Sequence, residues 1–513
     1  MSASGRRGRR IAIIGSGFSG LCLGIRLKQA GIESFTIFEK AEQLGGTWRD
    51  NTYPGAACDV PSFAYCFSFE QKTDWSRKWA PQEEIRGYMD HCARKYDLLR
   101  HIRFRTEIAS ARFDEAASVW RLRTAAGDEL EFDVLVSGVG QLNRPYVPAI
   151  PGLESFRGER FHSARWNHAY DLTGKRVAVV GNAASAIQFI PQIAPEVERL
   201  TILQRSANWM LPRGDRVYTA REKWLFTHVP LLARLYRWWI WLLLEMRFPL
   251  FRGNAFFASK TRDLALRNIE DSVSDPELRK ALVPDYPIGG KRILISDDYY
   301  PTLNRENVDV VTSPIERVTE DAVVTRDGAV HPVDAVILAT GFESTHFLAP
   351  MHVEGRDGRS LESEWKDGAR AYRGITVAGF PNLFLMYGPN TNLGHNSIIF
   401  MIECQAGYIV QAIRTLVDRD LASLDLEPAA MAAYDRKVQT ELAGSVWAAT
   451  PKSWYKTESG RITNNWSGTT TRYWWSTRRF DVESYRAEPR AAACRRADGA
   501  NADAVPPARA AAA

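Results

Sequence analysis

Residues 11–20 read Ile-Ala-Ile-Ile-Gly-Ser-Gly-Phe-Ser-Gly, an apolar run followed by three glycines in the spacing G-x-G-x-x-G. The apolar run predicts a buried strand, and residues 21–30 continue as a helix. Glycines here allow a tight turn and let the backbone approach a pyrophosphate at the helix N-terminus. A second predicted strand, residues 35–38, ends at Glu39, whose carboxylate can accept ribose hydroxyls. The stretch predicts a βαβ unit that binds a dinucleotide.

A second glycine segment follows soon after this unit. Residues 45–48, Gly-Gly-Thr-Trp, resemble the second glycine segment of flavoproteins that bind two dinucleotides. The resemblance favours FAD as the first dinucleotide, and it implies that Trp48 lies near the isoalloxazine ring.

A second βαβ unit is predicted further along the chain. The buried-strand pattern at 176–180 precedes Gly181-Asn-Ala-Ala-Ser-Ala186, in which alanine replaces the second and third glycines. The next predicted strand, 200–203, leads to Arg205, which occupies the place that Glu39 has in the first unit. A guanidinium can hold a 2′-phosphate that a carboxylate would repel. The second site is therefore predicted to prefer NADPH. The alternative is that Arg205 is an ordinary surface arginine that contacts only solvent.

Two more strand-glycine patterns, 133–140 and 334–341, predict that the chain crosses between two domains. The expected fold class is α/β, with two dinucleotide-binding (Rossmann-like) domains, the NADPH domain nested within the FAD domain and carrying a helical insertion. The expected segments are 1–145 (FAD-binding, first part), 146–335 (NADPH-binding, with the insertion at about 210–285), 336–440 (FAD-binding, second part), 441–486 (an aromatic lid or packing arm) and 487–513 (a disordered tail).

Residues 224–251, within the insertion, are rich in Trp and Leu. Some of these apolar residues recur at helical spacing and form a stripe, which predicts an amphipathic helix whose stripe packs against the core. Trp238, Trp241 and Leu244 lie off the stripe and suggest a second apolar surface, which could line a substrate channel or contact a membrane surface. The charge-free run is far shorter than the roughly 20 residues of a membrane span. The predicted core-facing stripe comprises Leu232, Leu235, Tyr236, Trp239, Leu242, Leu243 and Met246.

Composition excludes several classes of function. The formal charge of +6 comes from arginines at the two ends of the chain, so a nucleic-acid-binding face is unsupported. The 9 His and 6 Cys do not have the spacing of metal ligands, so no metal site is predicted. Because the cysteines form no C-x-x-C and show no regular spacing, free thiols in a cytoplasmic protein are expected. The N-terminus, basic and then apolar, is interpreted as a strand and phosphate loop because glycines interrupt its apolar run.

The string Phe-x-Gly-x-x-x-His-x-x-x-Trp at 156–166 lies just before the second unit. Together with two dinucleotide sites, it resembles the class B flavoprotein monooxygenases, and its final Trp resembles the Baeyer-Villiger type. Asn167 departs from the usual Pro or Asp. The resemblance implies coupling of domain motion, not proton transfer, for the four motif residues Phe156, Gly158, His162 and Trp166.

Two further segments extend this resemblance. Residues 53–59 resemble the loop that carries a flavin-facing Asp, here Asp59, and residues 290–292 resemble the active-site arginine segment. The resemblance implies that Lys291 joins Arg205 at the 2′-phosphate and that Arg292 pairs with Asp59 in the active site. A purely structural ion pair is the alternative.

The resemblance implies that NADPH reduces the flavin and that O₂ forms a C4a-peroxyflavin, which attacks a small apolar ketone and yields an ester or lactone. A fixed cation such as Arg292 would stabilise the anions formed. The alternatives are an N- or S-oxygenating flavin monooxygenase and a non-catalytic nucleotide-sensing accessory protein. The implied FAD contacts are Gly15, Ser16, Gly17, Phe18, Ser19, Gly20, Glu39, Lys40, Gly46, Thr47, Trp48, Asp59, Tyr65, Ile108 and Asn390. The implied NADPH contacts are Gly181, Asn182, Ala183, Ala184, Ser185, Ala186, Gln188, Arg205, Ser206, Lys291 and Arg292.

Overall fold

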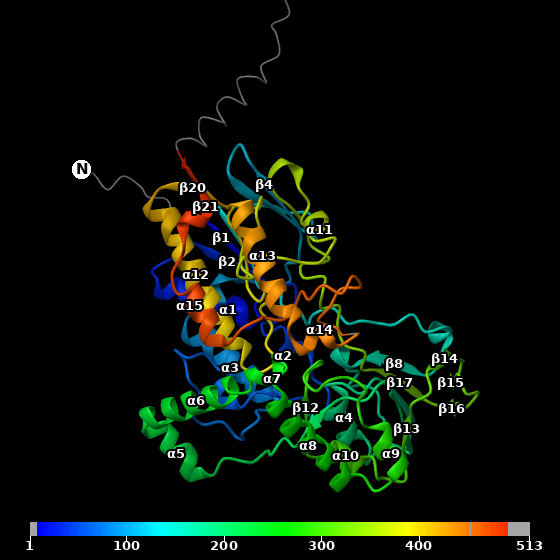
Figure 1. Ribbon diagram of the computed structural model, residues 1–513. Coiled ribbons are helices and arrows are strands. Elements are labelled where there is room, and N and C mark those ends of the chain that lie inside the picture. The colour runs from blue at the N-terminus through cyan, green and yellow to red at the C-terminus, as the bar shows by residue number, and fades with distance from the viewer. Residues whose placement is uncertain (1–7, 452, 491–513) are drawn as a thin grey trace, which may run out of the picture.

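The first of two parallel sheets contains the strands of the opening βαβ unit (Figure 1). The computed structural model describes residues 8–451 and 453–490. The predicted strands 11–14 and 35–38 are confirmed, and the strand order is β19-β7-β1-β2-β3. Helices α1 (Phe18–Gln29) and α12 (Ile398–Asp418) pack together beside this sheet. The strands are β1 (Ile11–Ile14), β2 (Phe35–Phe38), β3 (Ile102–Arg103), β7 (Val134–Ser137) and β19 (Leu383–Leu385).

The second parallel sheet has the order β13-β10-β9-β17-β8. Its strands all come from the middle of the chain, whereas the first sheet takes strands from both sides of that stretch. Helix α4 (Ala186–Ile193) follows β9, as α1 follows β1. The strands are β8 (Glu159–His162), β9 (Arg176–Val180), β10 (Arg199–Leu203), β13 (Val308–Val311) and β17 (Ala335–Leu338).

The remaining strands form smaller sheets. One is four-stranded, from β4 (Ile108–Asp114), β5 (Val119–Thr124), β6 (Glu129–Phe132) and β18 (His352–Glu354). Another is three-stranded, from β14 (Ile315–Val318), β15 (Ala322–Thr325) and β16 (Val330–Pro332). A short parallel pair, β11 (Met210–Leu211) with β12 (Leu294–Ile295), brings together two segments that lie far apart in the sequence.

The two chain crossings between the large sheets run side by side. Pro145 and Phe342 form an isolated antiparallel bridge, and the Tyr146 amide donates to the Gly341 carbonyl at 2.9 Å. Backbone hydrogen bonds therefore join the two crossings at the points where the chain passes from one sheet to the other.

The predicted tail boundary at residue 487 is wrong. Residues 487–489 belong to β21 (Tyr485–Pro489), which pairs antiparallel with β20 (Leu421–Leu426). Glu488 lies 3.0 Å from the buried guanidinium of Arg356, a contact between segments that no local pattern reveals. Residues 491–513 of the predicted tail lie outside the described residues.

The inserted segment is helical, as predicted, but the predicted orientation of its Trp-rich helix is wrong. Most of the stripe expected in the core is exposed, with Leu235 at 54%, Trp239 at 50% and Met246 at 50%. The buried residues of α6 are Ala233, Ile240 and Leu244. The helices are α5 (Ala220–His228), α6 (Pro230–Glu245), α7 (Phe248–Phe251), α8 (Ala255–Ser272) and α9 (Pro276–Ala281).

Helices α5 and α6 pack against the core of the first sheet, although they lie between strands of the second sheet in the sequence. Phe63, in a 3-10 helix at Ser62–Ala64, contacts the rings of Phe226 and Tyr236 at centroid distances of 4.7 and 5.1 Å. These aromatic contacts select the face of α6 that is buried. The helices lie at the lower left of Figure 1.

The C-terminal aromatic segment is mainly a packing arm. Tyr455, Trp466 and Tyr473 are buried in one hydrophobic cluster, whereas Trp454 lines the cavity described below. The helices of this region are α13 (Pro428–Ala443), α14 (Val446–Ala449) and α15 (Thr470–Thr477).

Candidate functional site

Both predicted nucleotide turns open into one cavity, with a volume of about 1010 Å³. Gly20, Ala186 and Asn390 do not line it, nor do the four motif residues of 156–166. The predicted cofactor residues that line it are Gly15, Ser16, Gly17, Phe18, Ser19, Glu39, Lys40, Gly46, Thr47, Trp48, Asp59, Tyr65, Ile108, Gly181, Asn182, Ala183, Ala184, Ser185, Gln188, Arg205, Ser206, Lys291 and Arg292. The cavity therefore connects the two turns with the Asp59 and Arg292 segments.

The glycines of the first turn have separate physical roles. Gly15 has φ +100°, and a Cβ there would lie 2.8 Å from the Gly138 carbonyl oxygen. A Cβ on Gly46 would lie 3.4 Å from the Gly17 Cα, so two bare backbone segments face one another in the cavity wall. A Cβ on Gly20 would lie 2.0 Å from the Gly15 oxygen, which makes Gly20 a packing residue between helix and strand.

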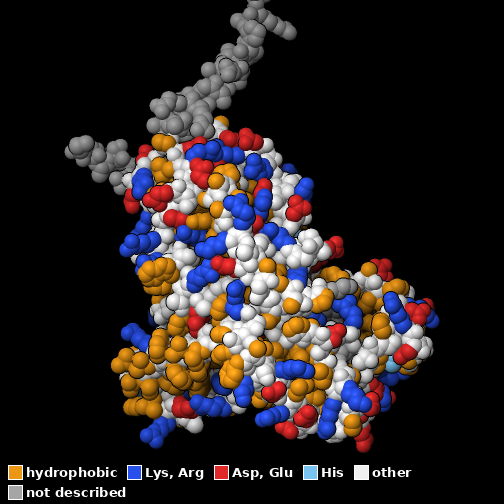
Figure 2. All heavy atoms as spheres, in the orientation of Figure 1, with side chains coloured by type: hydrophobic (Ala, Val, Ile, Leu, Met, Phe, Trp, Pro, Cys, Tyr) orange, Lys and Arg blue, Asp and Glu red, His pale blue; other side chains and the backbone are white. Residues whose placement is uncertain are grey.

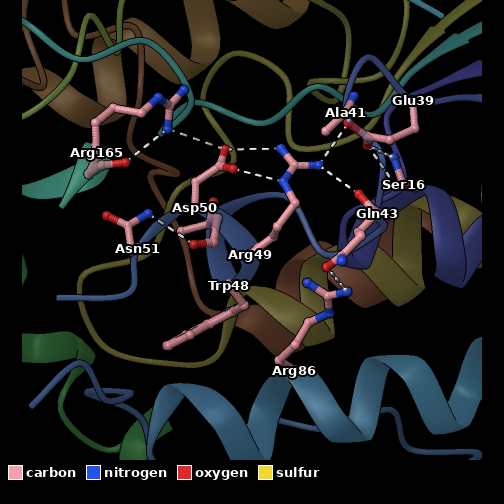
Figure 3. Close-up of polar contacts among 12 residues, drawn as sticks. Ser16, Glu39, Ala41, Gln43, Trp48, Arg49, Asp50, Asn51, Arg86 and Arg165 are labelled. Atoms are coloured by element: carbon pink, nitrogen blue, oxygen red, sulfur yellow. Dashed lines mark hydrogen bonds and ion pairs between the residues drawn. The ribbon is translucent and has the colours of Figure 1, made fainter. Parts of the chain in front are cut away.

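Glu39 is buried at the end of β2, and its carboxylate is saturated with protein donors (Figure 3). Oε2 accepts from the amide and the hydroxyl of Ser16 at 3.1 and 2.6 Å. Oε1 accepts from the Ala41 amide at 3.0 Å and from Arg49 Nη1 at 2.8 Å. A ribose hydroxyl would have to share these oxygens or displace one of the donors. Sequence reasoning missed Arg49, which no motif marks.

The polar chain continues from Arg49 to the 156–166 string. Arg49 Nε lies 2.8 Å from Asp50 Oδ1, and Arg165 Nη1 lies 3.6 Å from Asp50 Oδ2 (Figure 3). Burial lowers the pKa of Arg49, but the hydrogen bond to Asp50 and the charge of Glu39 outweigh burial and raise it. A line of alternating charges thus joins Glu39 to Arg165. Arg165 occupies an unspecified position of the string, so the motif gives no signal for it.

His162 and Trp166 lie at the junction between the sheets, away from the cavity. His162 Nδ1 accepts from the Ala164 amide at 3.1 Å, and its ring contacts Phe342, on the second crossing, at 5.8 Å. Burial lowers the pKa of His162. The Trp166 ring contacts Phe189, in α4, at 5.1 Å. The role of the string in coupling the two units stays a prediction.

Gly158 is expected to be a packing residue of the string. A Cβ there would lie 2.4 Å from the Asp334 carbonyl oxygen and 2.5 Å from the Phe156 ring. We expect Gly158→Ala to destabilise the fold by about 1–3 kcal/mol through overpacking. Urea unfolding measures this change. The matched control is Gly87→Ala in α3 (Gln82–Lys95), where a Cβ meets nothing within 4 Å and a gain of about 0.5–1 kcal/mol is expected. Equal urea unfolding midpoints for Gly158→Ala and Gly87→Ala would contradict the packing role of Gly158.

Asp59 and Arg292 form an ion pair in the cavity wall, as predicted. Arg292 Nε and Nη2 lie 2.6 and 2.5 Å from Asp59 Oδ2. The charge of Asp59 raises the pKa of Arg292 above its usual range, against the effect of burial. The side chains stay 33% and 30% exposed, so a reactant in the cavity can reach both. Arg292 therefore provides a permanent cation at this wall.

Arg205 and Lys291 line the same part of the cavity, because the pairing of β11 with β12 brings their segments together. Lys291 Nζ donates to Ser206 Oγ at 3.3 Å and lies 4.3 Å from the centre of the Tyr286 ring. Burial lowers the pKa of Lys291, and the charge of Arg205 acts in the same direction. Arg205 is exposed and forms no ion pair with any acidic residue in 8–451 or 453–490. The two cations thus form a basic corner of the cavity.

Gln188 lines the cavity and also joins the two nucleotide units. Its amide donates to the Ala57 carbonyl at 3.0 Å and accepts from the Tyr53 hydroxyl at 3.0 Å. Gly55 makes this contact possible, because a Cβ there would lie 2.6 Å from the Gln188 carbonyl oxygen. The loop that carries Asp59 is thereby held against α4.

Residues that follow β19 also line the cavity. Tyr387, Asn392, Leu393 and Asn396 line the cavity after β19, and the Tyr387 hydroxyl donates to Asn392 at 2.8 Å. The sequence marks this region by the predicted strand ending at Tyr387, the Gly-Pro-Asn turn at 388–390 and the segment 394–397, which resembles the family's flavin-proximal loop. Sequence reasoning missed only Asn392 and Leu393 among these four residues. Asn390 itself donates to the carbonyls of Ile462 and Asn465 and holds this loop to the C-terminal arm.

Comparison with known proteins agrees with this geometry. The sequence matches the family described as FMO-like, flavin-binding monooxygenase-like, over residues 8–354. The chain belongs to this family. It is 45% identical to a Baeyer-Villiger monooxygenase of Pseudomonas aeruginosa, over 93% of this chain and 91% of the relative.

Solved structures of monooxygenases superpose on the chain and agree with the family found from the sequence. An oxidised steroid monooxygenase bound to NADP superposes with a TM-score of 0.83 at 31% identity, over 94% of this chain and 100% of the other. A complex of OTEMO with FAD and NADP superposes with a TM-score of 0.82 at 26% identity, over 91% and 97%. The predicted family, fold class and enzyme class are confirmed.

Proposed function

We propose that this family member is an NADPH- and O₂-dependent monooxygenase of the Baeyer-Villiger type, which inserts one oxygen atom next to a ketone carbonyl. The observation that carries the proposal is the Asp59–Arg292 ion pair in the wall of a cavity shared by two nucleotide turns. The similarity to the P. aeruginosa enzyme supports it. Among the described residues, no contact in the cavity favours N- or S-oxygenation, one of the two alternatives that the sequence left open.

FAD is the cofactor that fits the first turn. The backbone cradle formed by Gly15, Gly17 and Gly46 has no Cβ atoms where a pyrophosphate would approach. Trp48 and Tyr65, joined by a 3.1 Å hydrogen bond, form the wall next to it. NADPH fits the second turn, because Arg205 and Lys291 offer two cations to its 2′-phosphate.

The strand order supports the proposed domain division. The strands of the first sheet come from residues 11–137 and 383–385, and those of the second from 159–338. An NADPH domain nested within the FAD domain would account for this pattern. Because β17 ends at Leu338, the NADPH domain would end a few residues beyond the predicted boundary at 335. Helices α5 and α6 would then belong to the inserted segment while packing on the FAD domain.

The overall reaction balances as ketone, NADPH, H⁺ and O₂ giving ester or lactone, NADP⁺ and water. Reduced FAD, when bound, activates O₂ and supplies the transferred oxygen. Negative charge develops on the ketone oxygen as the activated oxygen adds to the carbonyl carbon. The guanidinium of Arg292 would provide a fixed positive charge at this wall of the cavity. Asp59 orients the guanidinium through two contacts to one oxygen.

The test is product analysis with the purified holoenzyme. A panel of apolar ketones, NADPH and oxygen should give esters or lactones, with one NADPH consumed per product, and ¹⁸O₂ should label the product. An absence of labelled ester, together with labelled N-oxide or sulfoxide from amines or sulfides, would assign the chain to the other oxygenating class.

A further inference from the structure

The largest feature that the proposed reaction does not use is an exposed apolar face on α5 and α6. Figure 2 shows apolar side chains gathered over these helices at the lower left, with Lys and Arg side chains at the edge. We call this the α5–α6 face. Its exposed apolar residues are Trp224, Val229, Leu231, Leu232, Leu235, Trp238, Trp239, Leu243 and Met246.

The exposure is large for each side chain. Leu231 is 65% exposed, Trp224 is 57% and Trp238 is 56%. Single exposed apolar residues are ordinary, but a contiguous set on two adjoining helices marks an interaction surface. Helix α6 has 16 residues, which makes the face roughly 24 Å long.

The exposed charges of the face are mainly positive. The only acids of residues 220–247 are Glu222 and Glu245. Glu222 pairs with Arg216 at 2.8 Å, and Glu245 lies within 3.4 Å of His395 and accepts from Thr470 at 2.8 Å. Arg221 and Arg234 are exposed. Glu222 is thus paired with a cation and Glu245 is turned inward, with its side chain 11% exposed, so the exposed charge at the face is mainly positive.

We propose that the α5–α6 face docks on an anionic lipid membrane. Tryptophans beside leucines and arginines are the composition of helices that lie in a membrane interface, where apolar side chains enter the acyl boundary and cations meet lipid phosphates. A second copy of the chain is disfavoured by charge, because a two-fold interface on this face would bring two positively charged surfaces together. The helix lies on the membrane instead of crossing it, since no helix of the described residues is long and apolar enough to span.

The test is co-sedimentation of the holoenzyme with vesicles. We expect binding to vesicles of equimolar phosphatidylcholine and phosphatidylglycerol, weaker binding to phosphatidylcholine alone, and a decrease with added salt. Leu235→Ser/Trp239→Ser should lower the partition coefficient at least about tenfold. Arg234→Gln should lower it about fivefold on anionic vesicles and leave binding to neutral vesicles unchanged.

Two controls match these variants. Val330→Ser removes a 60% exposed apolar side chain on β16, at the opposite side of Figure 1. Arg436→Gln removes an exposed arginine of α13. Both should bind vesicles as the parent does, and circular dichroism should show that all variants fold. Equal sedimentation of the parent and Leu235→Ser/Trp239→Ser would overturn the proposal. So would a lipid-independent dimer in light scattering that this double variant abolishes.

Discussion

Replacing Arg292 by alanine is expected to lower ester formation about 10²–10³-fold. In the proposed reaction the guanidinium is the cation that would face the developing oxyanion, and removal of one such group typically costs this much in rate. The substitution also leaves Asp59 without the partner that lies 2.5 Å away, so a negative charge would replace a neutral pair at the cavity wall. Stopped-flow measurement of flavin reduction by NADPH and chromatographic measurement of ester separate the two half-reactions.

Arg292→Lys is the matched variant for this prediction. It keeps the positive charge but loses the two-point contact with Asp59, so an intermediate rate of ester formation is expected. A decrease confined to ester formation, with NADPH still consumed, would support a role in oxygen transfer. Unchanged ester formation in Arg292→Ala would reduce the pair to a structural ion pair.

Arg205→Ala is expected to raise the KM for NADPH roughly tenfold or more and to leave the KM for NADH nearly unchanged. The reason is the loss of charge-assisted hydrogen bonds to the 2′-phosphate, worth roughly 1.5–3 kcal/mol. Arg205 has no acidic partner among the described residues, so its removal frees no buried carboxylate. Steady-state NAD(P)H oxidation with each coenzyme measures the change.

Arg199→Ala provides the control, because this arginine begins β10, the strand that leads to Arg205, pairs with Asp309 at 2.6 Å and does not line the cavity. It should affect neither coenzyme. Lys291→Ala should act in the same direction as Arg205→Ala, since Lys291 lines the same basic corner. Equal effects of Arg205→Ala on NADPH and NADH would contradict the assignment of the 2′-phosphate site.

Local sequence was sufficient for the two nucleotide units. The strands at 11–14, 35–38 and 176–180 have the predicted bounds, because short apolar runs bounded by glycine turns are a signal carried by neighbouring residues. Glu39 and Arg205 followed from the register of those strands, and both line the cavity. The Asp59–Arg292 pair came from family resemblance, since nothing local connects residues so far apart.

Helix α6 shows where local pattern fails. Both of its faces are apolar, so periodicity alone could not select the buried one. The selection came from Phe63, whose ring contacts Tyr236 at 5.1 Å, and from the small Ala233. The same limit applies to Arg49 and Arg165, which gained their roles only from Asp50 lying between them.

The sequence by itself determined the family, the two nucleotide-binding units and the opposite charges at their strand ends, because these depend on residues close together in the chain. Tertiary structure alone decided which distant segments meet. The pairing of β11 with β12 brings Lys291 to Arg205, and packing on the first core turns the Trp-rich face of α6 outward. Such contacts depend on the shape and burial of surfaces contributed by several segments, which no single stretch of sequence encodes.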